Sequence, residues 1–151
     1  MIRLTQVIVR SFNGNMEDAG YTHVMIAFPS IKPLIMQVNG KSQTTLWLDQ
    51  NSQSVRIIDH TQLPHDFCVL ELSELDDFCA AIRDMQVRGA PLIGVTAAYG
   101  LAIALREDPG SDNEQRASAA LLATRPTAVN LRWAIERVRQ AIAGLAPGDR
   151  A

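Results

Sequence analysis

The sequence lacks a strong charge of either sign, and it has few cysteines and few histidines. Its 151 residues carry a formal net charge of −2, which excludes the bulk positive field that recruits nucleic acid or an anionic membrane. The two cysteines, Cys68 and Cys79, are not clustered as in a disulfide framework or a zinc site. We interpret both as buried, small apolar residues in a reducing cytoplasm. His23, His60 and His65 show no helical pairing for a metal, so the sequence predicts no metal and no cofactor.

The sequence also lacks an apolar run long enough to cross a membrane. Its most apolar uncharged stretch, Ala90 to Leu105, has about 16 residues, whereas a transmembrane helix needs roughly 20. We interpret this stretch as a buried core helix. Residues 1–35 show neither a secretory signal nor a mitochondrial transit peptide. The sequence therefore predicts a cytoplasmic protein with no membrane partner.

Residues 1–35 contain only short apolar runs and follow no regular pattern. One hypothesis is that Met36 is the natural start of the protein and that the preceding residues are not native. The other hypothesis is that these residues form a genuine but variable extension. We therefore divide the chain into an unassigned segment, 1–35, and one domain, 36–151.

Residues 44–72 have the pattern of a small antiparallel sheet. TTLWLDQ and SVRIID are rich in β-branched residues that alternate in polarity, with Asn51 and Ser52 between them as a turn, so they predict a hairpin. LPHDFCVLEL continues in an extended form, because Pro64 disfavours a helix at that point. The remaining residues have helical periodicity. The sequence therefore predicts an α+β fold, a small antiparallel β-sheet that leads into a helical cluster.

Two helices are expected first in this cluster. The first is capped by Ser73, has Asp76 at its third position as in a capping box, and carries apolar residues at helical spacing as far as Met85. The second runs from Pro91 to about Glu107, because proline is preferred in the first helical turn.

Two further helices are expected after residue 110. The third begins at Ser111, with Glu114 as its capping-box partner, and stops before Pro126 because the residue preceding a proline leaves the α region. The fourth is capped by Thr127 and carries Trp133, which we interpret as a core or interface residue.

The stretch MQVRGAPLIG, residues 85–94, places one arginine between two apolar segments. Arg88 is followed by Gly89 and Ala90, which are too small to obstruct a ligand, and then by a helix start. The first turn of a helix presents free N–H groups and a partial positive charge, and arginine adds a planar donor suited to phosphate or carboxylate. The alternative is that Arg88 is a surface residue paired with an acid such as Asp84. The pattern alone leaves both interpretations open.

Arg125 in ATRPTAVN repeats this arrangement, because an extended arginine precedes a proline and then a helix. Two arginines at two helix N-termini could converge on one anion. The alternative is that Arg125 only ends the preceding helix and caps its carbonyl groups.

The segments IRDMQVRGAPLIGVTAAYGLAIAL and TRPTAVNLRWAIERV, with LDQ and IIDHTQLP before them, resemble the N-terminal domain of the methylthioribose-1-phosphate isomerase family of methionine salvage. The resemblance covers about Met36 to the end of the chain. It implies a homodimeric enzyme whose second, Rossmann-like domain follows this one, and which converts 5-methylthioribose 1-phosphate to 5-methylthioribulose 1-phosphate. By the match, Arg88, Gly89, Ala90 and Arg125 bind the sugar phosphate.

The resemblance assigns no catalytic residue to this sequence. The family's catalytic cysteine and aspartate lie in the Rossmann-like domain, beyond residue 151, and neither Cys68 nor Cys79 stands in a matching motif. The chain is therefore expected to bind substrate without catalysis on its own, and to expose an apolar face where further protein docks. Two other functions stay open: a ribose-1,5-bisphosphate isomerase, and a non-catalytic regulatory protein of the initiation factor 2B-like family.

Overall fold

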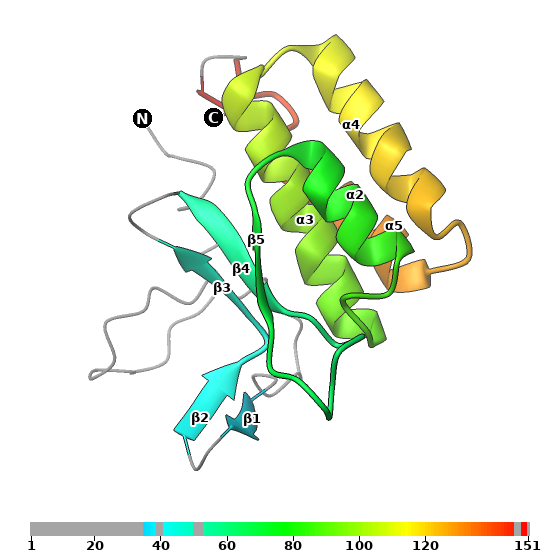
Figure 1. The fold of residues 1–151 in the computed structure, drawn as a ribbon. Helices are drawn as coiled ribbons and strands as arrows, with labels where there is room; N and C mark the ends of the chain where they lie inside the picture. The colour runs from blue at the N-terminus through cyan, green and yellow to red at the C-terminus, as the bar shows by residue number, and fades with distance from the viewer. Residues whose placement is uncertain (1–34, 39–40, 50–52, 147–148, 151) are drawn as a thin grey trace.

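The computed structural model describes residues 35–38, 41–49, 53–146 and 149–150 (Figure 1). The hypotheses about residues 1–35 fall outside this range apart from Ile35, and so does the expected turn at Asn51 and Ser52. In chain order the described elements are β1 (Ile35–Val38), β2 (Lys41–Thr44), β3 (Leu46–Asp49), β4 (Ser54–Ile58), β5 (Val69–Leu72), α2 (Leu75–Arg83), α3 (Ala90–Glu107), α4 (Ser111–Thr124) and α5 (Val129–Ile142).

The sheet that covers the helices is antiparallel, with strand order β3-β4-β5, and β1 and β2 form a separate antiparallel pair. Val55 and Ile57 on the central strand are fully buried in the core, and the residue between them points to the other face. There Arg56 pairs with Asp49 at 2.9 Å. The predicted hairpin is confirmed, because β3 and β4 pair antiparallel. The extended form predicted from Leu63 onward is confirmed at β5, but it is wrong at residues 63–65, which form turns.

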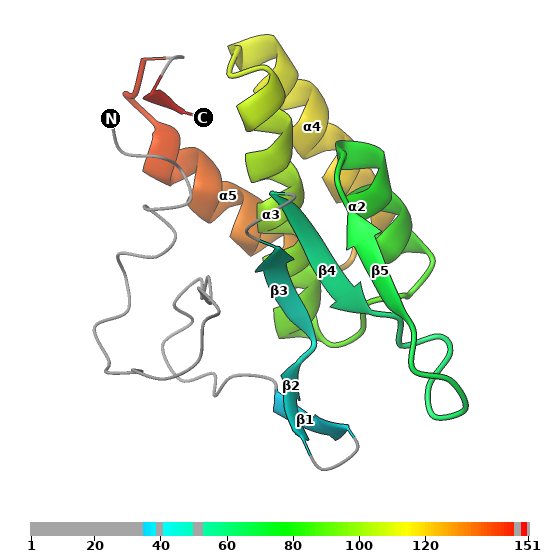
Figure 2. The same cartoon turned by 60° about the vertical axis from the view of Figure 1, so that its left-hand side comes forward.

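Helix α3 is the centre of the helical cluster and packs against α2, α4 and α5. Figure 1 shows that α3 and α5 begin at the same, lower end of the cluster, whereas α2 and α4 run in the opposite direction; Figure 2 shows the sheet beside them. Gly100 allows the close approach of α2, because a Cβ atom there would lie 2.8 Å from the Cβ of Phe78. The predicted α+β fold is confirmed.

The predicted start of α2 is wrong by one residue, and its predicted end is too late. Glu74 is the N-cap, and the third helical residue is Asp77, whose Oδ2 accepts hydrogen bonds from the backbone N–H of Glu74 at 3.1 Å and of Ser73 at 2.8 Å. Asp76 therefore lies one position too early for the capping box. The helix ends at Arg83, because Met85 has a φ of +61°, which α-helical backbone does not allow.

The predicted caps of α4 and α5 are also wrong. Gly110 and Ala128 occupy the two N-cap positions, and neither helix has a side-chain cap, so Ser111 and Thr127 do not serve as caps. Glu114 is buried and binds the Arg139 guanidinium of α5 at 2.7 Å. Its carboxylate joins two helices, which is why it is not available to cap its own.

The two cysteines differ in burial. Cys79 is buried on α2 as predicted, but Cys68 is exposed, so its predicted burial is wrong. Cys68 precedes β5, a strand at the edge of the sheet, and no described element covers it there. Among the described residues, no helix combines the length and the apolar character that crossing a membrane requires.

Candidate anion-binding site

The loop between α2 and α3 holds Arg88 in an exposed position on a fixed backbone. Val87 is fully buried, and its N–H donates to the carbonyl of Ala81 at 3.2 Å, which anchors the middle of the loop. Two residues with positive φ, Met85 at +61° and Gly89 at +90°, flank this anchor and turn the chain sharply. The exposed Arg88 therefore directly follows a residue whose position is fixed by the core.

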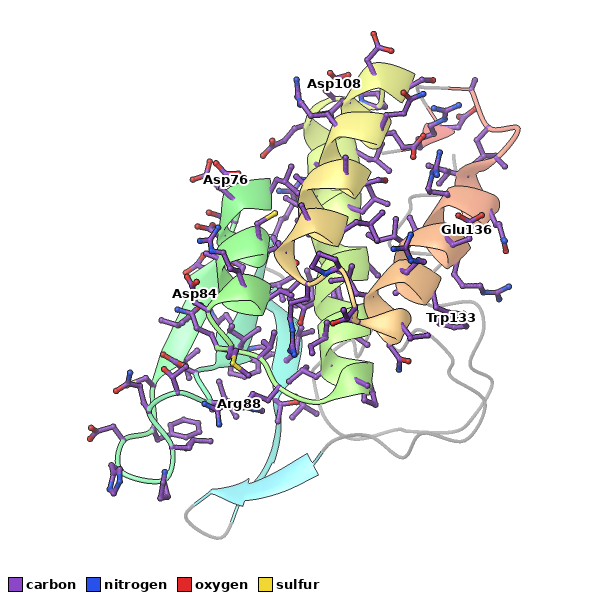
Figure 3. All side chains as sticks on the ribbon, turned by 90° about the vertical axis from the view of Figure 1, so that its right-hand side faces the viewer. Asp76, Asp84, Arg88, Asp108, Trp133 and Glu136 are labelled. Carbon is purple, nitrogen blue, oxygen red and sulfur yellow. The ribbon has the colours of Figure 1, made fainter. Side chains whose placement is uncertain are left out.

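The Arg88 side chain has no ion pair among the described residues. Its Nε donates one long hydrogen bond, 3.4 Å, to the carbonyl of Met85. The alternative partner, Asp84, is paired with Arg83 at 3.1 Å instead. Figure 3 shows Arg88 at the lower end of the helical cluster. The guanidinium thus keeps most of its donors for a ligand.

The first turn of α3 carries no internal compensation for its partial positive charge. Gly89 is its N-cap without any side-chain cap, and the turn contains no acidic residue. The N–H of Ile93 donates to the carbonyl of Gly89 at 3.0 Å, which begins the helical ladder, and Pro91 has no N–H to satisfy. Ala90 is exposed, so the turn is open to solvent. An uncapped helix N-terminus of this kind favours an anion.

Arg125 lies in the turn between α4 and α5, three residues before the N-cap of α5. It is the C-cap of α4, half-buried, with φ −147° and ψ 80°, and its carbonyl accepts from the N–H of Ala128 at 3.0 Å. The alternative role, capping the carbonyls of α4, is not observed within the described part of the chain. Thr124 provides that contact, because its hydroxyl donates to the carbonyl of Leu121 at 2.6 Å. The first turn of α5 also has no side-chain cap and no acidic residue.

These two helices differ from the other two in the cluster. The first turn of α2 contains Asp76 and Asp77, and that of α4 contains Asp112 and Glu114, whereas α3 and α5 have no acid there. Because α3 and α5 begin at the same end of the cluster, their two positive N-termini lie at that end together (Figure 1). Whether the two arginines contact one anion stays a prediction.

His60 also adjoins this loop, although the sequence pattern gave it no role. Its backbone N–H donates to the carbonyl of Gln86 at 2.9 Å. The pKa of its imidazole is lowered, first by burial and then by the Arg88 guanidinium, while Asp59 opposes the shift. Only the fold could reveal this proximity, because His60 and Arg88 are 28 positions apart in the sequence (88 − 60).

The other candidate groups do not form a site. Among the described residues, no three His, Cys, Asp or Glu side chains are grouped so as to hold a metal ion. Burial raises the pKa of the Cys79 thiol, which disfavours a nucleophilic thiolate. Trp133 is exposed on α5 (Figure 3), so its interpretation as a core residue is wrong, and the interface interpretation stays a prediction. The Arg137 guanidinium lies 5.7 Å from its ring centroid.

Sequence comparison finds known relatives of this chain. The sequence pattern of the Initiation factor 2 subunit family matches residues 86–149. The methylthioribose-1-phosphate isomerase of Methylocella silvestris is 55% identical over 115 residues, which are 76% of this chain and 31% of that protein. The chain thus spans less than a third of the length of this curated relative.

Two solved structures have the same fold over part of their length. The translation initiation factor eIF-2B, subunit delta, from A. fulgidus has a TM-score of 0.62 and 33% identity, over 70% of this chain and 32% of that one. The 5-methylthioribose 1-phosphate isomerase from Pyrococcus horikoshii OT3 has a TM-score of 0.61 and 34% identity, over 67% of this chain and 30% of that one. The resemblance drawn from the sequence is thereby confirmed.

Proposed function

We propose that residues 36–151 are the substrate-binding N-terminal domain of a methylthioribose-1-phosphate isomerase; the match of residues 86–149 to the Initiation factor 2 subunit family and the 55% identity to a named isomerase support this proposal. The reaction converts 5-methylthioribose 1-phosphate to 5-methylthioribulose 1-phosphate. One observation carries the proposal: α3 and α5 begin at the same end without side-chain caps or first-turn acids, α3 two residues after Arg88 and α5 four residues after Arg125.

In this proposal the site grips the phosphate of the sugar. Arg88 supplies a bidentate donor, the N–H groups of Gly89 and Ala90 at the start of α3 supply further donors, and Arg125 approaches from the start of α5. Gly89 and Ala90 have no bulk that keeps a ligand from the backbone. The phosphate sits on the anomeric oxygen and prevents easy ring opening, so a positioned acid–base group is also needed for hydrogen transfer. We assign that role to no residue of this chain.

Calorimetric titration of the 151-residue chain with 5-methylthioribose 1-phosphate tests the proposal. Arg88→Ala should weaken binding roughly tenfold or more, because a charge-assisted hydrogen bond is lost, and Arg88→Lys should restore only part of it. Arg125→Ala should weaken binding in the same way. The matched control is Arg116→Ala, which removes an exposed arginine bonded to Asn113 on α4 and should leave affinity unchanged.

Equal affinity of wild type and Arg88→Ala would refute the assigned site. A ribose-1,5-bisphosphate isomerase stays an alternative. It predicts that ribose 1,5-bisphosphate binds more tightly than the methylthio sugar, which the same titration distinguishes.

A second candidate function is that of a non-catalytic regulatory protein. The structural similarity to the initiation factor subunit from A. fulgidus, with a TM-score of 0.62, supports this second function. That reading predicts no measurable binding of either sugar phosphate. The uncapped, acid-free N-termini after Arg88 and Arg125 favour the isomerase instead, because a purely regulatory surface needs no anion site.

We further propose that the protein acts in the cytoplasm as a homodimer. The exposed large apolar side chains in the described part of the chain are candidates for burial in a complete assembly; they are Phe67, Val69, Met85, Val129 and Trp133. Sedimentation velocity of the chain at increasing concentration tests this proposal. Monomeric behaviour throughout would argue against self-association through this chain.

A further inference from the structure

His60 lies beside the loop that carries Arg88, yet it comes from a different part of the chain. Its backbone N–H donates to the carbonyl of Gln86 at 2.9 Å, which ties the residues after β4 to the loop two residues before Arg88. The Nε2 atom of its imidazole is buried and has no hydrogen-bond partner among the described residues. Buried polar atoms almost always have a partner, so this nitrogen is an exception that needs a physical reason.

Two charged groups, Asp59 and Arg88, act on the imidazole. Hydrogen bonds already stabilise the negative charge of Asp59. The carboxylate of Asp59 accepts hydrogen bonds at its Oδ1 from the N–H of Thr61 at 2.8 Å and from its hydroxyl at 2.7 Å. Within the part of the chain that the structure describes, the Arg88 guanidinium has one hydrogen bond, the 3.4 Å contact with the Met85 carbonyl. Burial and Arg88 together outweigh Asp59, so the pKa of His60 lies below its ordinary value of 6.5 and the imidazole of the empty site is mostly neutral at pH 7.

We propose that His60 is a second residue of the anion site, and that a dianion held by Arg88 is bound together with one proton, taken from solvent, on the His60 imidazole. The inference rests on the proposed function only in placing an anion at Arg88. A dianion there offsets the guanidinium charge that opposes protonation of His60, and it adds negative charge nearby. The imidazolium then supplies a second positive charge near the ligand. Attraction between this charge and the dianion offsets the cost of leaving Nε2 buried without a hydrogen-bond partner.

The direction of the pH effect follows from linkage. Binding of the dianion raises the pKa of His60, so protons are taken up at pH values between the empty-site and occupied-site pKa. Affinity is highest below the empty-site pKa, where the imidazole is already charged. It falls as the pH rises through the occupied-site pKa, and it is lowest where the imidazole is neutral in both states.

Sulfate is the suitable probe, because it stays a dianion across the whole pH range whereas phosphate itself titrates. The wild-type chain is titrated calorimetrically with sulfate between about pH 5.5 and about pH 8, the range over which histidines change charge. His60→Gln removes the titration and keeps a polar side chain. His65→Gln is the matched control, because His65 is exposed in the same turn region and bonds only through its backbone to Gln62 in the described structure.

We expect the wild type and His65→Gln to bind sulfate about fivefold more tightly at the acid end than at the alkaline end. His60→Gln should show a flat profile over the same range. The imidazole C–H resonance of His60 reports the same linkage in the wild type without any substitution. Its pKa should rise by about 0.7 unit when sulfate is added, which corresponds to the fivefold change in affinity.

The outcomes separate this inference from the proposed site. If Arg88→Ala abolishes sulfate binding while wild type and His60→Gln share one pH profile and the His60 resonance does not move, the role of His60 is refuted and the Arg88 site stands. If Arg88→Ala binds sulfate as tightly as wild type, the anion site itself is refuted and this inference falls with it.

Discussion

Gly89 has an unusual backbone conformation and lies within the candidate site, between Arg88 and the first turn of α3. Its φ is +90° and its ψ is 136°, a conformation that residues with a Cβ rarely adopt. A Cβ built at Gly89 meets nothing within 4 Å, so replacement by alanine creates no clash with the rest of the protein. The cost of Gly89→Ala is therefore almost entirely backbone strain, about 1–3 kcal/mol of unfolding free energy.

The strain should also disturb the site, because Gly89 is the N-cap of α3 and follows Arg88 directly. Relief of the strain requires a change of φ, which would move the Arg88 side chain and the first N–H groups of the helix. We therefore expect Gly89→Ala to lower the urea midpoint and to weaken sugar-phosphate binding, measured by urea denaturation and by calorimetric titration.

Gly144 provides a matched control for this prediction. It has a φ of +85° and also no atom within 4 Å of a built Cβ, but it follows α5, at the opposite end of that helix from its N-terminus. Gly144→Ala should carry a similar or smaller loss of stability and leave binding unchanged. Wild-type stability of Gly89→Ala, or an equal loss of affinity in both variants, would refute the reasoning.

Two further substitutions test the packing of the helices, and one labelling reaction tests the exposure of the cysteines. Arg139→Ala should lower stability by about 1–3 kcal/mol in urea denaturation, because it leaves the buried Glu114 carboxylate without its 2.7 Å partner; a neutral result would show that water replaces it fully. Gly100→Ala should cost about 1–3 kcal/mol through overpacking at the 2.8 Å approach, with sulfate affinity unchanged. A thiol reagent under native conditions should label exposed Cys68 readily and buried Cys79 only after unfolding, and mass spectrometry of peptides would reveal the reverse order.

The pattern of apolar residues predicted the three-stranded sheet and the four helices, but it did not predict the pair of strands β1 and β2, and it placed the ends of the helices less well. Alternation in SVRIID and helical spacing from Phe78 onward are strong signals, since they reflect which side chains the core buries. Polar residues at helix starts are weaker signals. Ser73 is the cap that residue type favours, yet Glu74 occupies the N-cap position of α2.

The sequence by itself determined the small sheet, the four helices and the two arginines that precede helix starts, because local spacing and the residues before proline and after glycine encode these features. Only the tertiary structure decided that α3 and α5 begin at one end, since that follows from their packing side by side. It also drew Glu114 to Arg139, and it placed His60 beside the Arg88 loop. Charges and polar atoms far apart in sequence acquire their partners only when the core brings their elements together, so no local pattern records them.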